Sequence, residues 1–147
     1  MTLTLHDLGE GDRQAWAPLW DAYCAFYKTE VPPWVTNRTW TRLTDPQVPI
    51  WGRLVRSGGR VVGFAHHLTH PSTWHEGPVC YLEDLFVAPE ARGTGAGRAL
   101  IDDLISICER RGWEQLYWIT AEDNATARKL YDFYDKADGM VRYRLDL

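Results

Sequence analysis

The chain has 147 residues, of which 45% are hydrophobic and 24% are charged, and its formal net charge is −4. These values fit a single globular domain over residues 1–147 and exclude disordered and fibrous proteins. A slightly acidic chain offers no basic field for nucleic acid, and no apolar run reaches the ~18 residues of a membrane-spanning helix. We therefore expect neither nucleic acid nor a membrane as a partner.

Two features indicate a cytoplasmic protein with reduced thiols. Residues 1–10 lack the basic start and apolar core of a signal peptide. Cys24, Cys80 and Cys108 are odd in number and form no C-x-x-C pair, which argues against a disulfide framework and against a zinc knuckle.

The first half of the chain predicts a strand, two helices and a hairpin. Residues 2–7 alternate as a strand, and residues 16–27 repeat apolar side chains at helical spacing. Pro18 within that repeat predicts a late helix start or a kink. A second helix is expected over residues 34–43, and glycines join two apolar runs into a hairpin over residues 50–68.

The hairpin is followed by four histidines between His66 and His75. A zinc site is poorly supported there, because no carboxylate or cysteine pattern accompanies them. His66 and His67 are neighbours on one strand, so they face opposite sides of it. We expect no metal at these histidines, and one or two of them near a ligand-binding cleft.

The second half predicts strands that alternate with helices. Residues 79–87 form an apolar strand, a helix runs from the following glycine loop to Gly112, and residues 116–120 form the next strand. Such a unit is a right-handed crossover between parallel strands. Residues 124–134 predict a last helix and residues 140–147 a last strand. The predicted fold class is therefore α/β, with a central mixed sheet flanked by helices on both faces.

The glycine loop is the most informative segment. Arg92 to Gly97 reads Arg-Gly-Thr-Gly-Ala-Gly and lies between a buried strand and a helix start. Glycines let backbone N–H groups converge, and the helix N-terminus adds unpaired N–H groups and a partial positive charge. The segment favours a phosphate-bearing ligand, to which Arg92 can add a charged contact. The alternative is a tight turn with a structural role alone.

Two common phosphate-binding motifs do not match this loop. A Rossmann fingerprint, G-x-G-x-x-G, requires the third glycine one place later than Gly97. A P-loop requires Gly-Lys-Ser/Thr where this chain has Gly97-Arg98-Ala99.

The segment from Val87 to Leu100 instead resembles the acetyl-CoA-binding segment of the GCN5-related N-acetyltransferases, whose pattern is Arg/Gln-x-x-Gly-x-Gly/Ala. Asn124, with the Ala, Leu and Tyr that follow it, is similar to a later helix of the same family. Tyr81 to Val87 looks like the subgroup that contains diamine and polyamine acetyltransferases. With the order of elements, the resemblance covers nearly the whole chain and implies that family's fold.

The resemblance implies acetyl-CoA as cofactor. It implies that loop amides hold the pyrophosphate, that the backbone of Phe86 and Val87 pairs with the pantetheine arm, and that an amide near Val87 polarises the thioester carbonyl. It also implies that Asn124 contacts the pantetheine and that Tyr131 protonates the departing thiolate. The full set expected to bind the cofactor is Leu85, Phe86, Val87, Arg92, Gly93, Thr94, Gly95, Ala96, Gly97, Arg98, Asn124, Arg128 and Tyr131.

An amine acceptor is mostly protonated at neutral pH, so its attack on a thioester requires a base. Glu83 is the predicted base and shares a strand face with Tyr81, Leu85 and Val87 under strict alternation. Asp84 then points to the opposite face, although a bulge would exchange the two. Either carboxylate can instead bind a neighbouring backbone group or arginine.

The predicted acceptor is a small cationic primary amine, such as a polyamine or an amino-acid-like amine. The residues expected to bind it are Tyr23, Tyr27, Trp34, Glu83 and Asp84. With Trp40 and Trp74, these aromatic residues can form a wall that packs an alkylammonium group, and the alternative for each is ordinary core packing. Two alternatives are an acetyltransferase of proteins or peptides and a non-catalytic acyl-CoA sensor, which needs neither Glu83 nor Tyr131. A third and weaker one is a protein-interaction module.

The C-terminus departs from the family pattern. The short linker 135–139 and a single strand, residues 140–147, replace the two strands that many members carry. A lone terminal strand leaves an open edge, so we expect it to pair or exchange between two chains of a homodimer.

Overall fold

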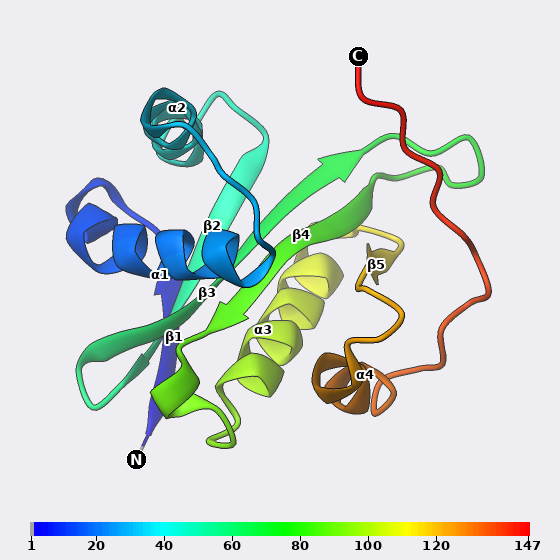
Figure 1. Ribbon diagram of the computed structural model, residues 1–147. Helices are drawn as coiled ribbons and strands as arrows, with labels where there is room; N and C mark the ends of the chain where they lie inside the picture. The colour runs from blue at the N-terminus through cyan, green and yellow to red at the C-terminus, as the bar shows by residue number, and fades with distance from the viewer. Residues whose placement is uncertain (1) are drawn as a thin grey trace.

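The computed structural model describes residues 2–147 (Figure 1). The strands are β1 (Leu3–Asp7), β2 (Ile50–Ser57), β3 (Arg60–His70), β4 (Val79–Val87) and β5 (Leu116–Trp118). The helices are α1 (Arg13–Phe26), α2 (Pro33–Leu43), α3 (Ala96–Arg111) and α4 (Ala125–Tyr131), with 3-10 turns η1 (Glu10–Asp12) and η2 (Pro89–Ala91). None of these described helices is long and apolar enough to cross a membrane.

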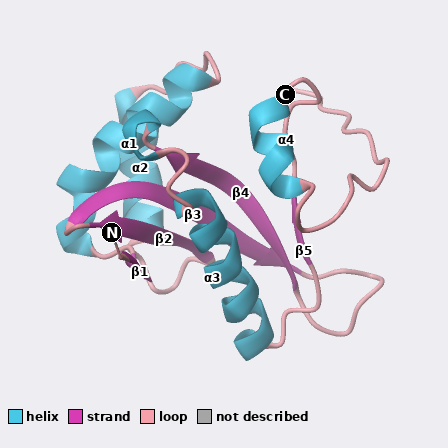
Figure 2. Cartoon of the chain, turned by 90° about the horizontal axis from the view of Figure 1, so that it is seen from below, coloured by secondary structure: helices cyan, strands magenta, loops and turns pink. Residues whose placement is uncertain are grey.

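The five strands form one sheet in chain order. The pairs from β1 to β4 are antiparallel, whereas β4 and β5 are parallel and joined through α3. Figure 2 shows helices on both faces of this sheet. The predicted mixed sheet and its parallel crossover unit are therefore confirmed.

Each face of the sheet buries its own apolar cluster. On one face, Trp16 of α1 and Trp40 of α2 pack on Phe64 and Phe86 of the sheet. On the other face, the stripe that includes Leu100 and Leu104 of α3 packs on β2, β3 and β4. The stripe ends where Gly112 adopts a left-handed conformation, with φ of 72°, and caps α3 as predicted.

α1 begins without delay at Arg13, directly after η1, so the late start expected from Pro18 is wrong. Pro18 lies inside the helix on its exposed side. The carbonyl that loses its helical partner there belongs to the exposed Gln14, so water can replace the missing N–H.

A β-bulge interrupts the pairing of β3 with β4. His66 pairs with Asp84 and His67 with Leu82, which leaves Glu83 as the extra residue. Leu82 belongs to the cluster under α3, but Phe86 belongs to the cluster under α1, so the facing pattern changes at the bulge. The strict alternation that placed Glu83 with Leu85 and Val87 is therefore wrong.

The predicted C-terminal strand, residues 140–147, is coil in the structure, and β5 and α4 end earlier than expected. The segment extends as coil to the C-terminus at the top of Figure 1, and all of its apolar side chains are exposed. An alternating pattern becomes a strand only where a partner strand offers its edge, and β5 has only three residues.

His67 is a buried imidazole on the face that packs against α3. It is 3% exposed, and its ring centroid lies 5.4 Å from that of Trp51 and 5.9 Å from that of Trp113. His66 lies on the opposite face with Trp16, as expected for neighbours on a strand. Burial, and next the charge of Arg53, lower the pKa of His67 to about 4.

This pKa predicts a loss of stability in mild acid. The unfolded chain takes up a proton near the ordinary pKa of about 6.5, whereas folded His67 resists protonation down to about 4. The contribution of neutral His67 to the free energy of unfolding is therefore complete above pH 6.5, and it declines as the pH falls toward 4. Urea unfolding at pH 7.5 and pH 5 should show a loss of about 2 kcal/mol that is absent from His67→Leu. Equal losses in both proteins would contradict this assignment.

Candidate active site

The edge of β4 that faces β5 is only partly paired. The two strands pair from Cys80 to Leu82, and beyond Glu83 the structure shows no strand on that edge within the described residues. Backbone groups of alternate strand residues point to opposite edges, and the Ala88 N–H donates to Val62 of β3. The backbone groups of Leu85 and Val87 therefore point away from β3, toward the side on which β5 has ended. An extended ligand can bind such an edge as an added strand does.

The glycine loop closes one end of this opening. Gly93 and Gly95 have φ of 79° and 89°, and a Cβ on either would meet nothing within 4 Å. The N–H groups of the first turn of α3, which starts at Ala96, lie beside this open space. The loop is therefore a cradle into which an anion can fit.

Gly97 has a different reason to be glycine. A Cβ there would approach the Leu130 side chain to 3.2 Å, so glycine allows α4 to pack closely on α3. The spacing of the glycines in the sequence does not show whether Gly97 allows this packing contact or belongs to the anion cradle. The third glycine thus connects the loop to the helix that carries Tyr131.

The three arginines expected at the cofactor lie around the loop and α4. Arg92 donates from Nε to the carbonyl of Val87 at 3.2 Å and lies over the Phe26 and Phe86 rings. Arg98 lies 3.8 Å over the ring of Phe133, and Arg128 donates to the carbonyl of Glu122. All three are exposed or half-buried and border the cleft without closing it.

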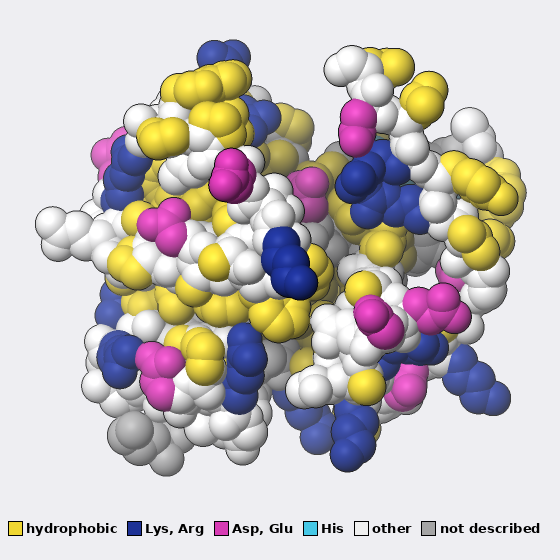
Figure 3. Space-filling model, in the orientation of Figure 1, with side chains coloured by type: hydrophobic (Ala, Val, Ile, Leu, Met, Phe, Trp, Pro, Cys, Tyr) yellow, Lys and Arg dark blue, Asp and Glu magenta, His cyan; other side chains and the backbone are white. Residues whose placement is uncertain are grey.

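Side chains from α1, β4, β5 and α4 meet at a small cavity where β4 and β5 separate. It is lined by Tyr23, Tyr27, Leu82, Glu83, Leu85, Trp118, Ile119 and Tyr131. The structure thus brings together four residues expected to perform or receive the chemistry: Tyr23, Tyr27, Glu83 and Tyr131. Figure 3 shows this face hollowed between the body that carries α1 and the part that carries α4.

The tyrosines of this cavity keep their protons. Burial, and then the proximity of Tyr27, raise the pKa of Tyr131 to about 12. Burial and the Asp84 carboxylate raise the pKa of Tyr27 and, further, that of Tyr23. A phenol in this state donates a proton and does not accept one.

Glu83 and Asp84 form a pair of adjacent carboxylates with different surroundings. Asp84 is half-buried and accepts hydrogen bonds from the Tyr23 hydroxyl at 2.7 Å and from His66 at 2.9 Å. Glu83 is exposed at the bulge, where partial desolvation and then the charge of Asp84 raise its pKa. Glu83 is therefore a better proton acceptor than an ordinary exposed carboxylate.

Asn124 caps α4, a role that its sequence pattern did not predict. Its side-chain oxygen accepts from the N–H of Ala127 at 3.4 Å, and its amide donates to Thr120. The cap starts the helix at a fixed point, and Tyr131 follows seven residues later, at two helical turns.

The predicted aromatic wall does not form. Trp40 is buried in the core, Trp34 is 68% exposed at the start of α2, and Trp74 is 86% exposed in the loop after β3. Only Tyr23 and Tyr27 of that set stand together, with ring centroids 5.0 Å apart. α2 buries Trp40 and Leu43 against the sheet and leaves Trp34 exposed, so its two tryptophans do not share one face.

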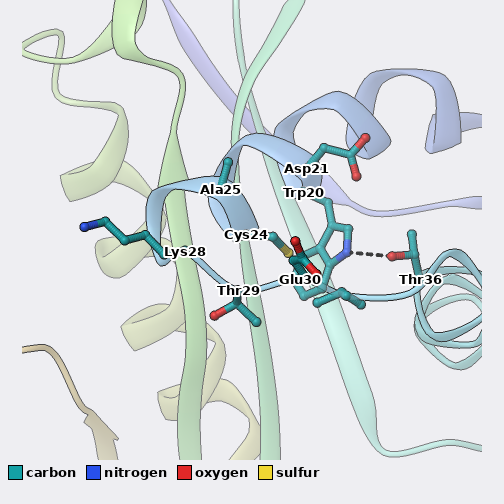
Figure 4. A pocket seen from close by; sticks show the side chains of 9 residues that line it. Trp20, Asp21, Cys24, Ala25, Lys28, Thr29, Glu30 and Thr36 are labelled. Carbon is teal, nitrogen blue, oxygen red and sulfur yellow. Dashed lines mark hydrogen bonds between the residues drawn. The ribbon is translucent and has the colours of Figure 1, made fainter.

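A larger cavity of about 480 Å³ lies between the end of α1 and α2 (Figure 4). Its lining is Trp20, Asp21, Cys24, Ala25, Lys28, Thr29, Glu30, Val31 and Thr36. Trp20, Cys24 and Glu30 converge in it, and Lys28 points away. Sequence reasoning missed these residues. The Val31-Pro32-Pro33 break between the two helices was the available signal, since it forces a cleft there.

Comparison with known proteins gives one consistent result. The model of the acetyltransferase (GNAT) family matches residues 14–133. The D-amino-acid N-acetyltransferase HPA3 of Saccharomyces cerevisiae is 41% identical over 122 residues, covering 82% of this chain and 76% of that protein. The thialysine N-epsilon-acetyltransferase of Mus musculus is 33% identical over 81 residues, which cover 55% of this chain and 47% of the mouse protein.

Solved structures repeat the fold. Ribosomal-protein-alanine N-acetyltransferase from Brucella melitensis biovar Abortus 2308 matches with a TM-score of 0.79 and 22% identity, over 99% of this chain and 100% of the other. AAC(6')-Iy in complex with the bisubstrate analogue CoA-S-monomethyl-acetylneamine matches with a TM-score of 0.83 and 16% identity, over 100% of both chains.

Proposed function

Because the chain belongs to the acetyltransferase (GNAT) family and is an N-acetyltransferase, we propose that it acetylates the primary amine of a small, cationic, amino-acid-like acceptor, with acetyl-CoA as donor. The observation that carries this proposal is that Glu83 and Tyr131 line one cavity with Tyr23, which bonds Asp84, beside a strand edge and a glycine cradle.

The residues present fit acetyl-CoA. The amides from Gly93 to Arg98 bind the pyrophosphate, in the space that a Cβ on Gly93 or Gly95 would fill. The outward-facing backbone of Leu85 and the N–H of Val87 would bind the pantetheine arm, and an N–H near Val87 would stabilise negative charge on the carbonyl oxygen. Bound acetyl-CoA supplies the thioester carbon that the amine attacks and a thiolate leaving group.

Glu83 and Tyr131 move the protons in this proposal. Glu83 removes a proton from the acceptor ammonium, directly or through water, because its raised pKa makes it a better base than an ordinary carboxylate. Tyr131 would donate its phenolic proton to the departing sulfur, and the resulting tyrosinate would take up the second proton, which the amine nitrogen loses as the amide forms. The two side chains line the same small cavity, so the proposed acceptor of one proton and donor of the other lie beside one space.

The acceptor enters on the side of α1. Asp84 attracts its ammonium group, and the cavity between α1 and α2 receives the rest of the molecule, where Glu30 adds a negative charge and Trp20 an aromatic surface. The yeast and mouse relatives are named for D-amino acids and for thialysine, which supports an amino-acid-like amine.

Gly95→Val tests the cradle. Acetyl-CoA should raise the melting temperature of the parent, because it binds the native state alone. The valine side chain occupies the anion space, so the acetyl-CoA shift should disappear, as measured by scanning fluorimetry.

Gly112→Val is the matched control. Gly112 lies at the other end of α3, has φ of 72°, and a Cβ there also meets nothing within 4 Å. Both variants carry the same backbone strain of about 1–2 kcal/mol, but only Gly95→Val should lose the shift. Loss of the shift in both, or in neither, would place the cofactor elsewhere.

Tyr131→Phe tests the catalytic proposal. The change keeps the ring and its packing on Trp118 but removes the phenolic acid. The rise in melting temperature on adding acetyl-CoA should therefore remain. Turnover of the best acceptor, measured by free-CoA release over a panel of amines and amino acids, should fall by roughly 10²–10⁴.

Tyr134→Phe serves as the control for packing and helix stability. Tyr134 follows α4, and its hydroxyl donates to the Asp102 carboxylate of α3 at 2.6 Å. Its loss should lower the melting temperature and leave turnover within about threefold of the parent. Turnover unchanged in Tyr131→Phe would reject Tyr131 as the acid, and no turnover with any amine in the parent would reject the activity.

We also propose a homodimer that uses residues 140–147. Val141, Tyr143 and Leu145 alternate with charged residues and are 77%, 95% and 83% exposed, and β5 presents an edge strand. A second copy of this segment can supply the missing partner strand. Sedimentation should show a dimer that Tyr143→Asp with Leu145→Asp converts to a monomer. A monomeric parent at high micromolar concentration would contradict the proposal.

A further inference from the structure

A buried chain of hydrogen bonds connects α1, β3 and β4 behind the acceptor side of the site. Nε1 of Trp16 lies 3.0 Å from Nε2 of His66, and Nδ1 of His66 lies 2.9 Å from Oδ2 of Asp84. The Tyr23 hydroxyl donates to the other Asp84 oxygen at 2.7 Å. Trp16 is fully buried and His66 is 5% exposed, so water does not compete for these bonds.

The chemistry of the chain assigns the proton on His66. An indole N–H only donates, so Nε2 of His66 must carry a lone pair. The proton of the neutral imidazole therefore lies on Nδ1, and His66 donates it to Asp84. The ring is held flat against Phe64, with centroids 4.6 Å apart, and beside Trp20 at 5.5 Å, so it cannot turn to offer the other nitrogen.

The Asp84 carboxylate is held at both oxygens. The bulge at Glu83 turns Asp84 toward α1 and pairs it with His66 across the strands. Each oxygen accepts one bond from the protein and retains a second lone-pair direction for a ligand. Tyr23 also lines the cavity with Glu83 and Tyr131. The hydrogen-bonded chain therefore ends at the cavity that holds the residues proposed to move protons.

We propose that His66 is a positioning residue: fixed in its Nδ1–H form by Trp16, it orients the Asp84 carboxylate so that this group receives the ammonium of the acceptor. The orientation role rests on the proposed function, whereas the assignment of the proton does not. His66 and His67 are neighbours on one strand, and the sequence does not distinguish their roles. The buried hydrogen bond with Trp16 distinguishes His66 from His67.

Two amide substitutions separate positioning from packing. The amide nitrogen of Asn is three bonds from Cα, as Nδ1 of histidine is, whereas that of Gln is four bonds away, as Nε2 is. His66→Asn can therefore still donate to Asp84, and His66→Gln cannot do so from the same place. His66→Gln should raise KM for the amine about ten- to a hundredfold, and His66→Asn should return it to within about threefold of the parent. The acetyl-CoA thermal shift and KM for acetyl-CoA should change in neither.

His67→Gln is the matched control, since it changes the neighbouring histidine on the opposite face. It should lower the melting temperature without raising KM for the amine. Equal KM values in His66→Asn and His66→Gln, or an equal rise in His67→Gln, would show that His66 only fills the core and would overturn the positioning role.

A spectrum of the unmodified protein tests the proton assignment without turnover. Nitrogen-15 NMR of labelled histidine at neutral pH should show Nδ1 of His66 protonated and Nε2 bare, and Asp84→Asn should shift the Nδ1 signal. A proton on Nε2, or protons on both nitrogens, would overturn the proposal. If the parent acetylates no amine but the spectrum is as expected, the proposed function fails and the assignment of His66 stands.

Discussion

The extra residue in β4, Glu83, determines which side chains reach each face of the sheet. Before the bulge, Leu82 faces α3; after it, Phe86 faces α1. The same shift turns Asp84 toward Tyr23 and His66 and leaves Glu83 at the mouth of the cavity. Without it, Asp84 would lie among the apolar residues under α3, where an unpaired carboxylate costs several kcal/mol.

β5 separates from β4 after Leu82, and this leaves backbone groups of β4 without a partner strand. A sheet edge that is left open in the interior must bind water, a ligand or another chain, because buried backbone groups need partners. Here the edge from Glu83 to Val87 lies beside an opening, and α1 and α4 supply aromatic side chains on its two sides. These aromatic side chains line the small cavity at the point where the two strands separate.

The sequence was sufficient where local chemistry dictates local structure. The glycine loop, the stripe of α3 and the cap at Gly112 each depend on a few neighbouring residues, and all three are present as predicted. The bulge could not be predicted with certainty, because an extra residue is recognised only by its partner strand. The roles of Trp34, Trp40 and Trp74 depended on the rotation of α2 and the path of a loop, which periodicity alone does not fix.

Positioning an amine and accepting its proton make opposite demands on one carboxylate, and two adjacent carboxylates can divide these two tasks. A group that positions the substrate must be held still, and Asp84 is held by two hydrogen bonds in a half-buried setting. A group that takes a proton must move and must bind that proton readily, and Glu83 lies free on the bulge with its pKa raised by desolvation and by the charge of Asp84. The fixed charge thus improves the mobile base, because a negative neighbour favours the protonated form of Glu83. In the proposed reaction the same fixed charge would also attract the ammonium group whose proton Glu83 would accept, so the order Glu83-Asp84 at the bulge would couple binding of the amine to its deprotonation.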